Sequence, residues 1–213
     1  MKLYWTVILF LYSLTGLCQE EPAFSYTHSA QIKNYKYSVF TGLDGTYVIK
    51  GQDTLLHLEE FYISVEFRDF NKDGYKDLFL DLGGNTPERY DLLLFNPKEL
   101  KFVAVKDFRD FPAPVMIPGT WYYYSYHKSG CADLNWDSDL FYIKGNKVIK
   151  IGTISGRECN DSGVKDGLYV YKQKRAGKKL YKSLPIQTIY KYKEHKWGFI
   201  KQYWERNFKD FVQ

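Results

Sequence analysis

Five residues in the first half of the chain alternate in a pattern that could bind a hard metal ion. Within the stretch RDFNKDGYKDLFL, the possible oxygen ligands are the side chains of Asp69, Asn71, Asp73 and Asp77 and the main-chain carbonyl of Tyr75. Alternate side chains of a tight turn converge on one point, and Gly74 permits the sharp bend that this wrapping requires. Calcium takes about six to eight oxygen ligands, so these residues, completed by water, predict a Ca²⁺ site.

The loop differs from a calcium switch of the EF-hand type. Leu80 stands where an EF-hand has a bidentate Glu, and neither flank is typical of a helix. The flanking stretches YISVEF and DLFLDL have the composition of β-strands. We therefore expect a strand–calcium loop–strand element in which the ion is a structural staple, because switching requires two helices that change their angle. The alternative is an acidic turn whose Asx side chains accept hydrogen bonds from their own backbone.

A second group of oxygen-bearing side chains alternates in the stretch CADLNWDSD. Its members are Asp133, Asn135, Asp137 and Asp139. This stretch has no central glycine, and a strand pattern resumes at once with LFYI. The sequence therefore favours an exposed turn beside Cys131, anchored by Trp136, over a second ion site.

The sequence carries no positive sign of a catalytic centre. Its four histidines are scattered, at His28, His57, His127 and His195. No HExxH, GxSxG or similar nucleophile motif is present. Two carboxylates far apart in sequence could still meet as a glycosidase pair. We expect a protein that is not an enzyme.

The elements that must position these residues are mostly short strands. Aromatic residues make up 19% of the chain, and half of them are Tyr, a composition typical of rings packed across β-sheets. Turn signals such as Asp44-Gly45, Asn96-Pro97 and Gly145-Asn146 separate the strands at intervals of about 8–12 residues. This spacing predicts an all-β fold of antiparallel strands and hairpins, as a sandwich, a barrel or a propeller-like array. Only the C-terminal stretch IKQYWERNFKDF fits a helix, and it fits a strand nearly as well.

The first 18 residues form a segment of their own. A basic Lys2 precedes a largely apolar run that is too short to span a bilayer as a helix. We interpret residues 1–18 as a secretory signal peptide and residues 19–213 as a single β-rich domain, exported to the periplasm or beyond and not transmembrane after cleavage. Lipidation of Cys18 is less favoured, because a lipobox has a small residue where Leu17 stands.

Removal of the signal peptide leaves two cysteines. An even number in an exported protein favours a disulfide, and Cys131 and Cys159 allow one intramolecular pairing. A metal or redox pair is the alternative, but no CxxC spacing or nearby histidine cluster supports it. We expect the bond to stabilise the fold by roughly 3–4 kcal/mol.

Two surfaces could bind a partner. The stretch TWYYYSY, which begins with Thr120 and Trp121, could expose rings that stack on sugars, although alternation along a strand makes at least one of its faces core. The C-terminal third is basic, since residues 165–209 hold 13 Lys and Arg against three acids. These cations could meet anionic lipids, anionic glycans or an acidic protein, or they could be the solvated face of a sheet. Nucleic acid is not expected as a partner of an exported chain.

The stretch DFNKDGYKDLFL resembles the D-x-[DN]-x-D-G-x-x-D-L calcium loop of FG-GAP/VCBS-type repeats, which occur in β-propeller blades. The loop is followed by the FNPKELKF hairpin, the aromatic YYYSY strand and a late hairpin. This order is similar to that of small exported bacterial proteins with a compact β-propeller-like fold, over roughly residues 61–151. The resemblance implies such an array, and it places the chain beside a group in which some members are periplasmic inhibitors or immunity proteins that block lysozyme-like enzymes.

The sequence is therefore compatible with two functions. The first is an exported, non-catalytic, calcium-stapled protein that binds a protein partner and inhibits a cell-wall hydrolase, as the resemblance implies. The second is a glycan-binding protein of the cell envelope that uses the aromatic strand and the basic C-terminal hairpin.

Overall fold

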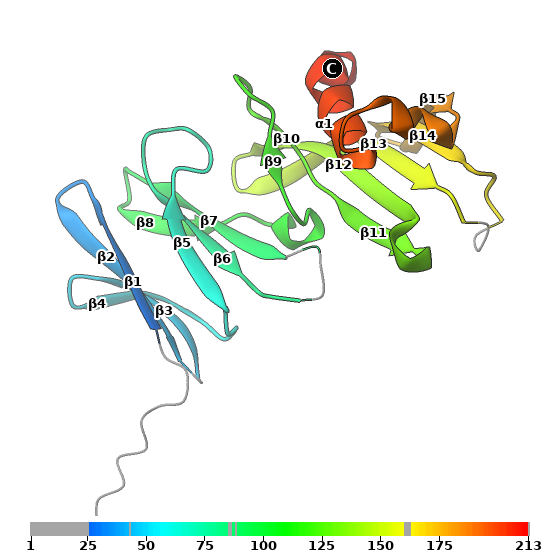
Figure 1. Ribbon diagram of the computed structural model, residues 1–213. Helices are drawn as coiled ribbons and strands as arrows, with labels where there is room; N and C mark the ends of the chain where they lie inside the picture. The colour runs from blue at the N-terminus through cyan, green and yellow to red at the C-terminus, as the bar shows by residue number, and fades with distance from the viewer. Residues whose placement is uncertain (1–25, 43, 85–86, 88, 160–162, 213) are drawn as a thin grey trace, which may run out of the picture.

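The computed structural model describes residues 26–42, 44–84, 87, 89–159 and 163–212, so the predicted signal peptide and Cys18 lie outside the described residues. The described chain forms three sheets of antiparallel strands followed by a C-terminal helix (Figure 1). The prediction of a β-rich fold made of short antiparallel strands and hairpins is confirmed.

The first two sheets are four-stranded meanders in which each strand pairs with the next along the chain. The first contains β1 (Tyr26–Ile32), β2 (Tyr35–Gly42), β3 (Gly45–Lys50) and β4 (Asp53–Leu58). The second contains β5 (Ser64–Arg68), β6 (Asp77–Asp81), β7 (Tyr90–Asn96) and β8 (Lys101–Ala104). Local turn chemistry builds these hairpins, as at Asn96, whose side-chain oxygen accepts hydrogen bonds from the N–H groups of Lys98 and Glu99.

The third sheet is larger, with the order β15-β14-β13-β12-β10-β9, and β11 also pairs with β12. Its strands are β9 (Val115–Met116), β10 (Tyr122–Tyr124), β11 (His127–Gly130), β12 (Asn135–Lys144), β13 (Lys147–Arg157), β14 (Gly167–Lys174) and β15 (Gly177–Leu184). The helical segments are η1 (Phe108–Asp110), η2 (Cys131–Asp133), η4 (Ile186–Lys191), α1 (Lys196–Asn207) and η5 (Phe208–Phe211). The turn predicted at Gly145-Asn146 joins β12 to β13, and Ala176-Gly177 forms the turn between β14 and β15.

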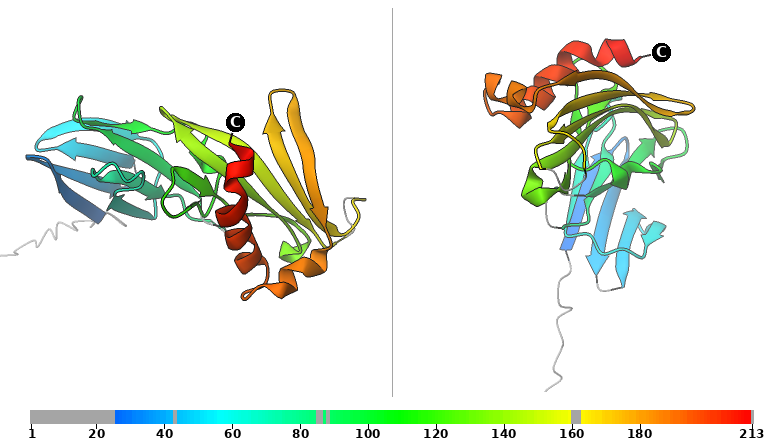
Figure 2. Two further views of the ribbon diagram at one scale, coloured as in Figure 1. Left: turned by 90° about the horizontal axis from the view of Figure 1, so that it is seen from above. Right: turned by 90° about the vertical axis from the view of Figure 1, so that its right-hand side faces the viewer.

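The sheets follow one another along the molecule, with β1–β4 at one end and β14–β15 at the other (Figure 2). Side chains of β6 show how the middle sheet is covered on both faces. Leu78 and Leu80 belong to the core shared with the first sheet, whereas Phe79 belongs to the core shared with the third. A run of buried residues along β6 is the expected signature of a strand with two covered faces.

The C-terminal stretch that fits either a helix or a strand is helical. Phe199, Tyr203 and Trp204 share one face of α1 and pack on the third sheet, in a core that includes Trp136 and Leu140. The indole N–H of Trp204 donates to the buried hydroxyl of Ser138 at 2.9 Å. A helix, rather than a further sheet, covers this outer face. The meanders have the connectivity of propeller blades, while the described elements close no ring.

Candidate functional site

The acidic loop connects β5 to β6, as the sequence predicts, and its ends are held by the pairing of Arg68 with Asp77. Lys72 and Gly74 have positive φ values of 62° and 90°, so the chain reverses sharply between them. Gly74 is well suited to this conformation because a side chain would be strained there. The predicted strand–loop–strand geometry is therefore confirmed, whatever occupies the loop.

The oxygens of the loop accept hydrogen bonds from its own backbone. Asp69 accepts from the N–H groups of Asp73 and Gly74, each at 3.1 Å. Asn71 Oδ1 accepts from Asp73 N at 3.0 Å, and Asp73 Oδ1 accepts from Tyr75 N at 2.9 Å. These contacts make the Asx turn that was the alternative to an ion site.

The donor chemistry of the loop fits a hard cation, since it offers carboxylate and amide oxygens. Each carboxylate oxygen that accepts one N–H keeps a second lone pair. Over the described ranges, however, no three His, Cys, Asp or Glu side chains come together in a group that could hold a metal ion. The Ca²⁺ site at Asp69, Asn71, Asp73, Tyr75 and Asp77 stays a prediction.

Asp77 has a different environment from the other acids of the loop. Its side chain is fully buried, with one oxygen accepting from Phe70 N at 3.0 Å and the other from Phe95 N at 2.9 Å. Burial raises its pKa to about 6, and the two N–H groups oppose that rise because they favour the charged form. Asp77 thus ties the loop to β7.

Aromatic stacking fixes the loop to the third sheet. The ring of Phe70 lies 4.9 Å from that of Tyr123, with an interplanar angle of 8°. The hydroxyl of Tyr123 donates to the carbonyl of Phe70 at 3.2 Å. Phe70 also stacks on Phe79 of β6 at 5.6 Å. The acidic loop is therefore held against β10 from within the core.

A tight hairpin between β9 and β10 projects from the sheet beside this loop (Figure 1). It is closed by Ile117 N donating to Tyr122 O at 2.9 Å, while the hydroxyl of Thr120 donates to Ile117 O at 2.8 Å and accepts from Tyr122 N at 3.1 Å. Gly119 has a φ of 71° within the turn. Trp121 follows and is 69% exposed.

The hairpin and the acidic loop border one shallow hollow of about 250 Å³. Its lining includes Asn71 and Asp73 from the loop, Trp121 and Tyr123 from the hairpin side, and Ile143 from β12. We call the acidic loop together with this hairpin the loop–hairpin surface. Asn71 and Asp73 of the acidic loop thus border the same hollow as one exposed indole on a hydrogen-bonded turn, an arrangement suited to protein or sugar contact.

The aromatic stretch TWYYYSY, expected to have at least one core face, has both of its faces covered. Tyr123, Tyr124 and Tyr126 are all buried, with Tyr123 in the core facing the second sheet and the other two in the core under α1. Both faces of the strand are therefore covered, because it lies between two packed layers. Of the residues in TWYYYSY, Trp121 is the large apolar one that stays exposed.

The second oxygen cluster is divided among different partners. Asp133 accepts hydrogen bonds from Tyr126 and Lys196, and Asn135 accepts from the main-chain N–H groups of Glu158 and Cys159. Asp137 accepts from Arg157 and Ser155. Asp139 accepts from Thr153 and lies within hydrogen-bond distance of His127. A strand begins at Asn135, so the alternate side chains of Asn135, Asp137 and Asp139 are spread along one extended face instead of wrapping one point. Trp136 is buried, as expected for an anchor.

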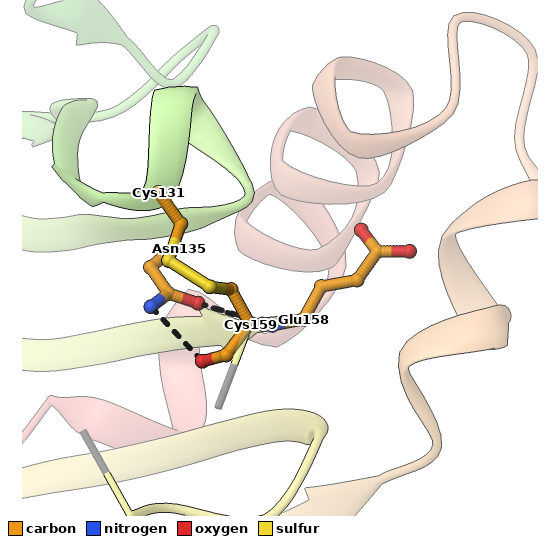
Figure 3. Close-up of a disulfide and its surroundings, with 4 residues drawn as sticks. All are labelled: Cys131, Asn135, Glu158 and Cys159. Carbon is orange, nitrogen blue, oxygen red and sulfur yellow. Dashed lines mark hydrogen bonds between the residues drawn. A yellow bond between two sulfur atoms is a disulfide. The ribbon is translucent and has the colours of Figure 1, made fainter. Parts of the chain in front are cut away.

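The predicted disulfide between Cys131 and Cys159 is present. Asn135 supports it, since its side-chain oxygen accepts from the N–H groups of Glu158 and Cys159 and its amide donates to the carbonyl of Cys159 at 3.3 Å (Figure 3). This role of Asn135 is not evident from the sequence, where its position in the alternating pattern is that of an ion ligand. The bond joins η2 to the segment that follows β13.

The histidines do not gather into a site. His57 stacks on Tyr47 at 4.3 Å, and His127 approaches the buried carboxylate of Asp139 at 3.4 Å. His195 precedes α1 and contacts the ring of Tyr190. These three histidines lie on different elements, and no group of three His, Cys, Asp or Glu side chains that could hold a metal ion occurs among the described residues.

No protein-family model matches the chain, and no curated protein matches it either. None of the helices in the described part is long and apolar enough to cross a membrane. A solved structure described as "Structure of a Xanthomonas Type IV Secretion System related protein" is similar, with a TM-score of 0.51 and 16% sequence identity. The similarity covers 73% of this chain and 93% of that one, and at this identity it bears on the fold alone.

Proposed function

We propose that this chain is an exported, non-catalytic binding protein that blocks a cell-wall hydrolase with its loop–hairpin surface. The observation that carries the proposal is the exposed Trp121 on a hydrogen-bonded hairpin beside the acidic loop. Tryptophan is enriched among the residues that dominate binding energy, and a turn that is already ordered loses little entropy on binding. A projecting, ordered turn of this kind suits insertion into an enzyme cleft.

Three further features support the proposal. The N-terminal sequence has the features of a signal peptide, and a disulfide suits an oxidising compartment. The similar solved structure is described as related to a secretion system, which is compatible with a role outside the cytoplasm. The resemblance of the acidic loop to FG-GAP/VCBS-type repeats links the chain to a group that includes lysozyme inhibitors and immunity proteins.

Calcium would act as a staple in this function. Asp69, Asn71 and Asp73 would hold the ion with the carbonyl of Tyr75, and Asp77 would contribute a remaining lone pair. The ion would neutralise the three carboxylates and fix the loop next to Trp121. Its chemical role is charge neutralisation, and the binding surface itself is made by the protein.

The experiment is an inhibition assay with a panel of lysozyme-type hydrolases acting on peptidoglycan. We expect the wild-type chain to inhibit at least one, and Trp121→Ala to weaken that inhibition by about thirtyfold, the equivalent of a contact worth about 2 kcal/mol. Tyr190→Ala is the matched control, since Tyr190 is 55% exposed on η4, which is not part of the loop–hairpin surface. Absence of binding to every hydrolase would refute the inhibitor function.

The glycan-binding alternative now depends on Trp121, because the tyrosines that follow it are buried or half-buried. A pull-down with insoluble peptidoglycan separates the two functions. Retention of the wild-type chain on peptidoglycan without any hydrolase, lost in Trp121→Ala, would favour the glycan function.

A further inference from the structure

The β14–β15 hairpin is the most strongly charged element of the molecule. Residues 167–184 contain no Asp or Glu, and they carry six cations: Lys172, Lys174, Arg175, Lys178, Lys179 and Lys182. None of these six lies within ion-pair distance of a carboxylate in the described parts of the chain. Lys172 Nζ donates to the main-chain carbonyl of Asp210, and none of the six charges is neutralised by a carboxylate among the described residues.

The hairpin also lies where a partner can reach it. β15 is the outer strand of the seven-stranded sheet, and seven of its eight residues are exposed. The hairpin stands at the end of the molecule opposite the first sheet (Figure 2). It is therefore remote from the N-terminal strands.

Exposed apolar surface is interspersed among these cations. Leu180 is 50% exposed and Tyr181 is 46% exposed. Aromatic rings support two of the lysines, since Lys172 Nζ lies 4.0 Å from the ring centre of Tyr181 and Lys178 Nζ lies 4.5 Å from that of Tyr171. Leu180 lies on the same face of the hairpin as Tyr171 and Lys178. Tyr181 lies on the face of Lys172, so each face combines cations with one exposed apolar or phenolic side chain.

We propose that the β14–β15 hairpin docks on an anionic phospholipid surface. Five of the six cations are lysines, which act as flexible point charges and suit a diffuse negative surface better than a defined bidentate ligand. Basic segments are attracted to anionic lipids, and exposed Leu and Tyr side chains favour the interfacial region of a bilayer. This function is independent of the loop–hairpin surface, which is formed by other elements.

The test is co-sedimentation of the chain with two kinds of vesicle, one of pure phosphatidylcholine and one of equal parts phosphatidylglycerol and phosphatidylcholine. We expect binding to the anionic vesicles alone, weakening as salt is raised. Replacing Lys178, Lys179 and Lys182 together by Gln should reduce that binding about a hundredfold, because each cation near such a surface contributes substantially to affinity. Leu180→Ser should weaken it further at high salt, where the apolar contribution remains.

The matched control replaces Lys36, Lys98 and Lys106 by Gln, which removes the same charge from exposed positions on the first two sheets and the segment after them. That variant should bind as the wild type does, and melting curves should show that both triple variants are folded. Equal loss in the two variants would overturn the proposal, since net charge alone would then explain binding. Binding to single-stranded oligonucleotides but not to anionic vesicles would also overturn it, in favour of a nucleic-acid partner.

Discussion

The ring of Phe70 lies flat against that of Tyr123, with centres 4.9 Å apart, and the two residues are also joined by the hydrogen bond from the Tyr123 hydroxyl to the Phe70 carbonyl. They are 53 residues apart in sequence. Through this pair the acidic loop of the second sheet contacts the β10 strand of the third. The loop conformation and the position of the β9–β10 hairpin are therefore coupled.

Removing the stacked ring should weaken the whole fold. Phe70→Ala is expected to lower the free energy of unfolding by about 3–5 kcal/mol, because it leaves a cavity in the core between the second and third sheets. Tyr123→Phe should cost only about 1 kcal/mol, since it removes one hydrogen bond and keeps the stack. Urea unfolding followed by tryptophan fluorescence measures the free energy of unfolding of both variants. Equal losses in Phe70→Ala and Tyr123→Phe would show that the ring stack is not the main contact.

The buried carboxyl of Asp77 should make stability depend on pH. Its pKa in the folded chain is raised from 3.8 to about 6, so between about pH 4 and pH 6 the native state binds more protons than the unfolded state. This contribution to stability is complete below about pH 4 and is lost as pH rises through about 6, a loss of roughly 2–3 kcal/mol.

Asp77→Asn provides the comparison, with chelator present so that no cation competes. The variant loses one acceptor for the N–H groups of Phe70 and Phe95 and should be less stable at every pH. The stability difference between wild type and variant should shrink as pH rises from 4 to 7. A difference that stays constant with pH would show that Asp77 is charged throughout.

Calcium should raise the melting temperature of the chain. A site with a dissociation constant of about 10⁻⁴–10⁻³ M, typical of extracellular modules, gives about 1.5–3 kcal/mol of stabilisation at roughly 10 mM calcium. Asp73→Ala should abolish the difference between calcium and chelator, whereas Glu59→Ala, an exposed acid outside the loop, should retain it. If chelator has no effect on the wild type, the loop is an Asx turn without an ion.

Local chemistry in the sequence was enough to predict many elements of the fold. The Asn96 turn, the strand–loop–strand element around Gly74 and the Cys131–Cys159 bond each depend on residues whose conformational or chemical preference is strong. Their positions follow from short-range geometry, and for the disulfide from the small number of cysteines. Such local features form regardless of how the rest of the chain packs.

The layering of the sheets could not be predicted in the same way. Alternation along TWYYYSY indicates two faces, but the number of faces that are covered depends on sheets formed elsewhere in the chain. Tyr123 faces the second sheet and Tyr124 faces the core under α1, so both faces are filled. The helical state of α1 is a second example, because the packing of Phe199 and Trp204 selects it over a strand. The assembly of Trp121 with the acidic loop is a consequence of this layering.

Loss of the disulfide should destabilise the fold without changing the loop–hairpin surface. Cys131 and Cys159 are separated by 28 residues in sequence, and closing a loop of that size stabilises the native state by about 3–4 kcal/mol in the chain-entropy model. Replacing both cysteines by Ser is expected to lower the free energy of unfolding by that amount, measured by urea unfolding. Inhibition of the target hydrolase at 20 °C should persist, and its loss in a variant that is still folded would place the disulfide in the binding site.

Gly156 should tolerate no side chain, because the indole of Trp136 occupies the space above it. The two residues are paired across β12 and β13, and a Cβ atom at position 156 would lie 2.1 Å from Cε2 of Trp136. Trp136 is 1% exposed, so its indole is enclosed by the core. Gly156→Ala is therefore expected to lower the free energy of unfolding by about 1–3 kcal/mol or more.

The clash can be separated from a backbone effect by a double-mutant cycle with Trp136→Phe. Each single variant should be destabilised, Trp136→Phe because it leaves a cavity and Gly156→Ala because it overfills the site. In the double variant the smaller ring leaves space for the added methyl group, so the combined loss should be smaller than the sum of the two. Strict additivity in urea unfolding would mean that the cost at Gly156 comes from the backbone of β13 and not from contact with the indole.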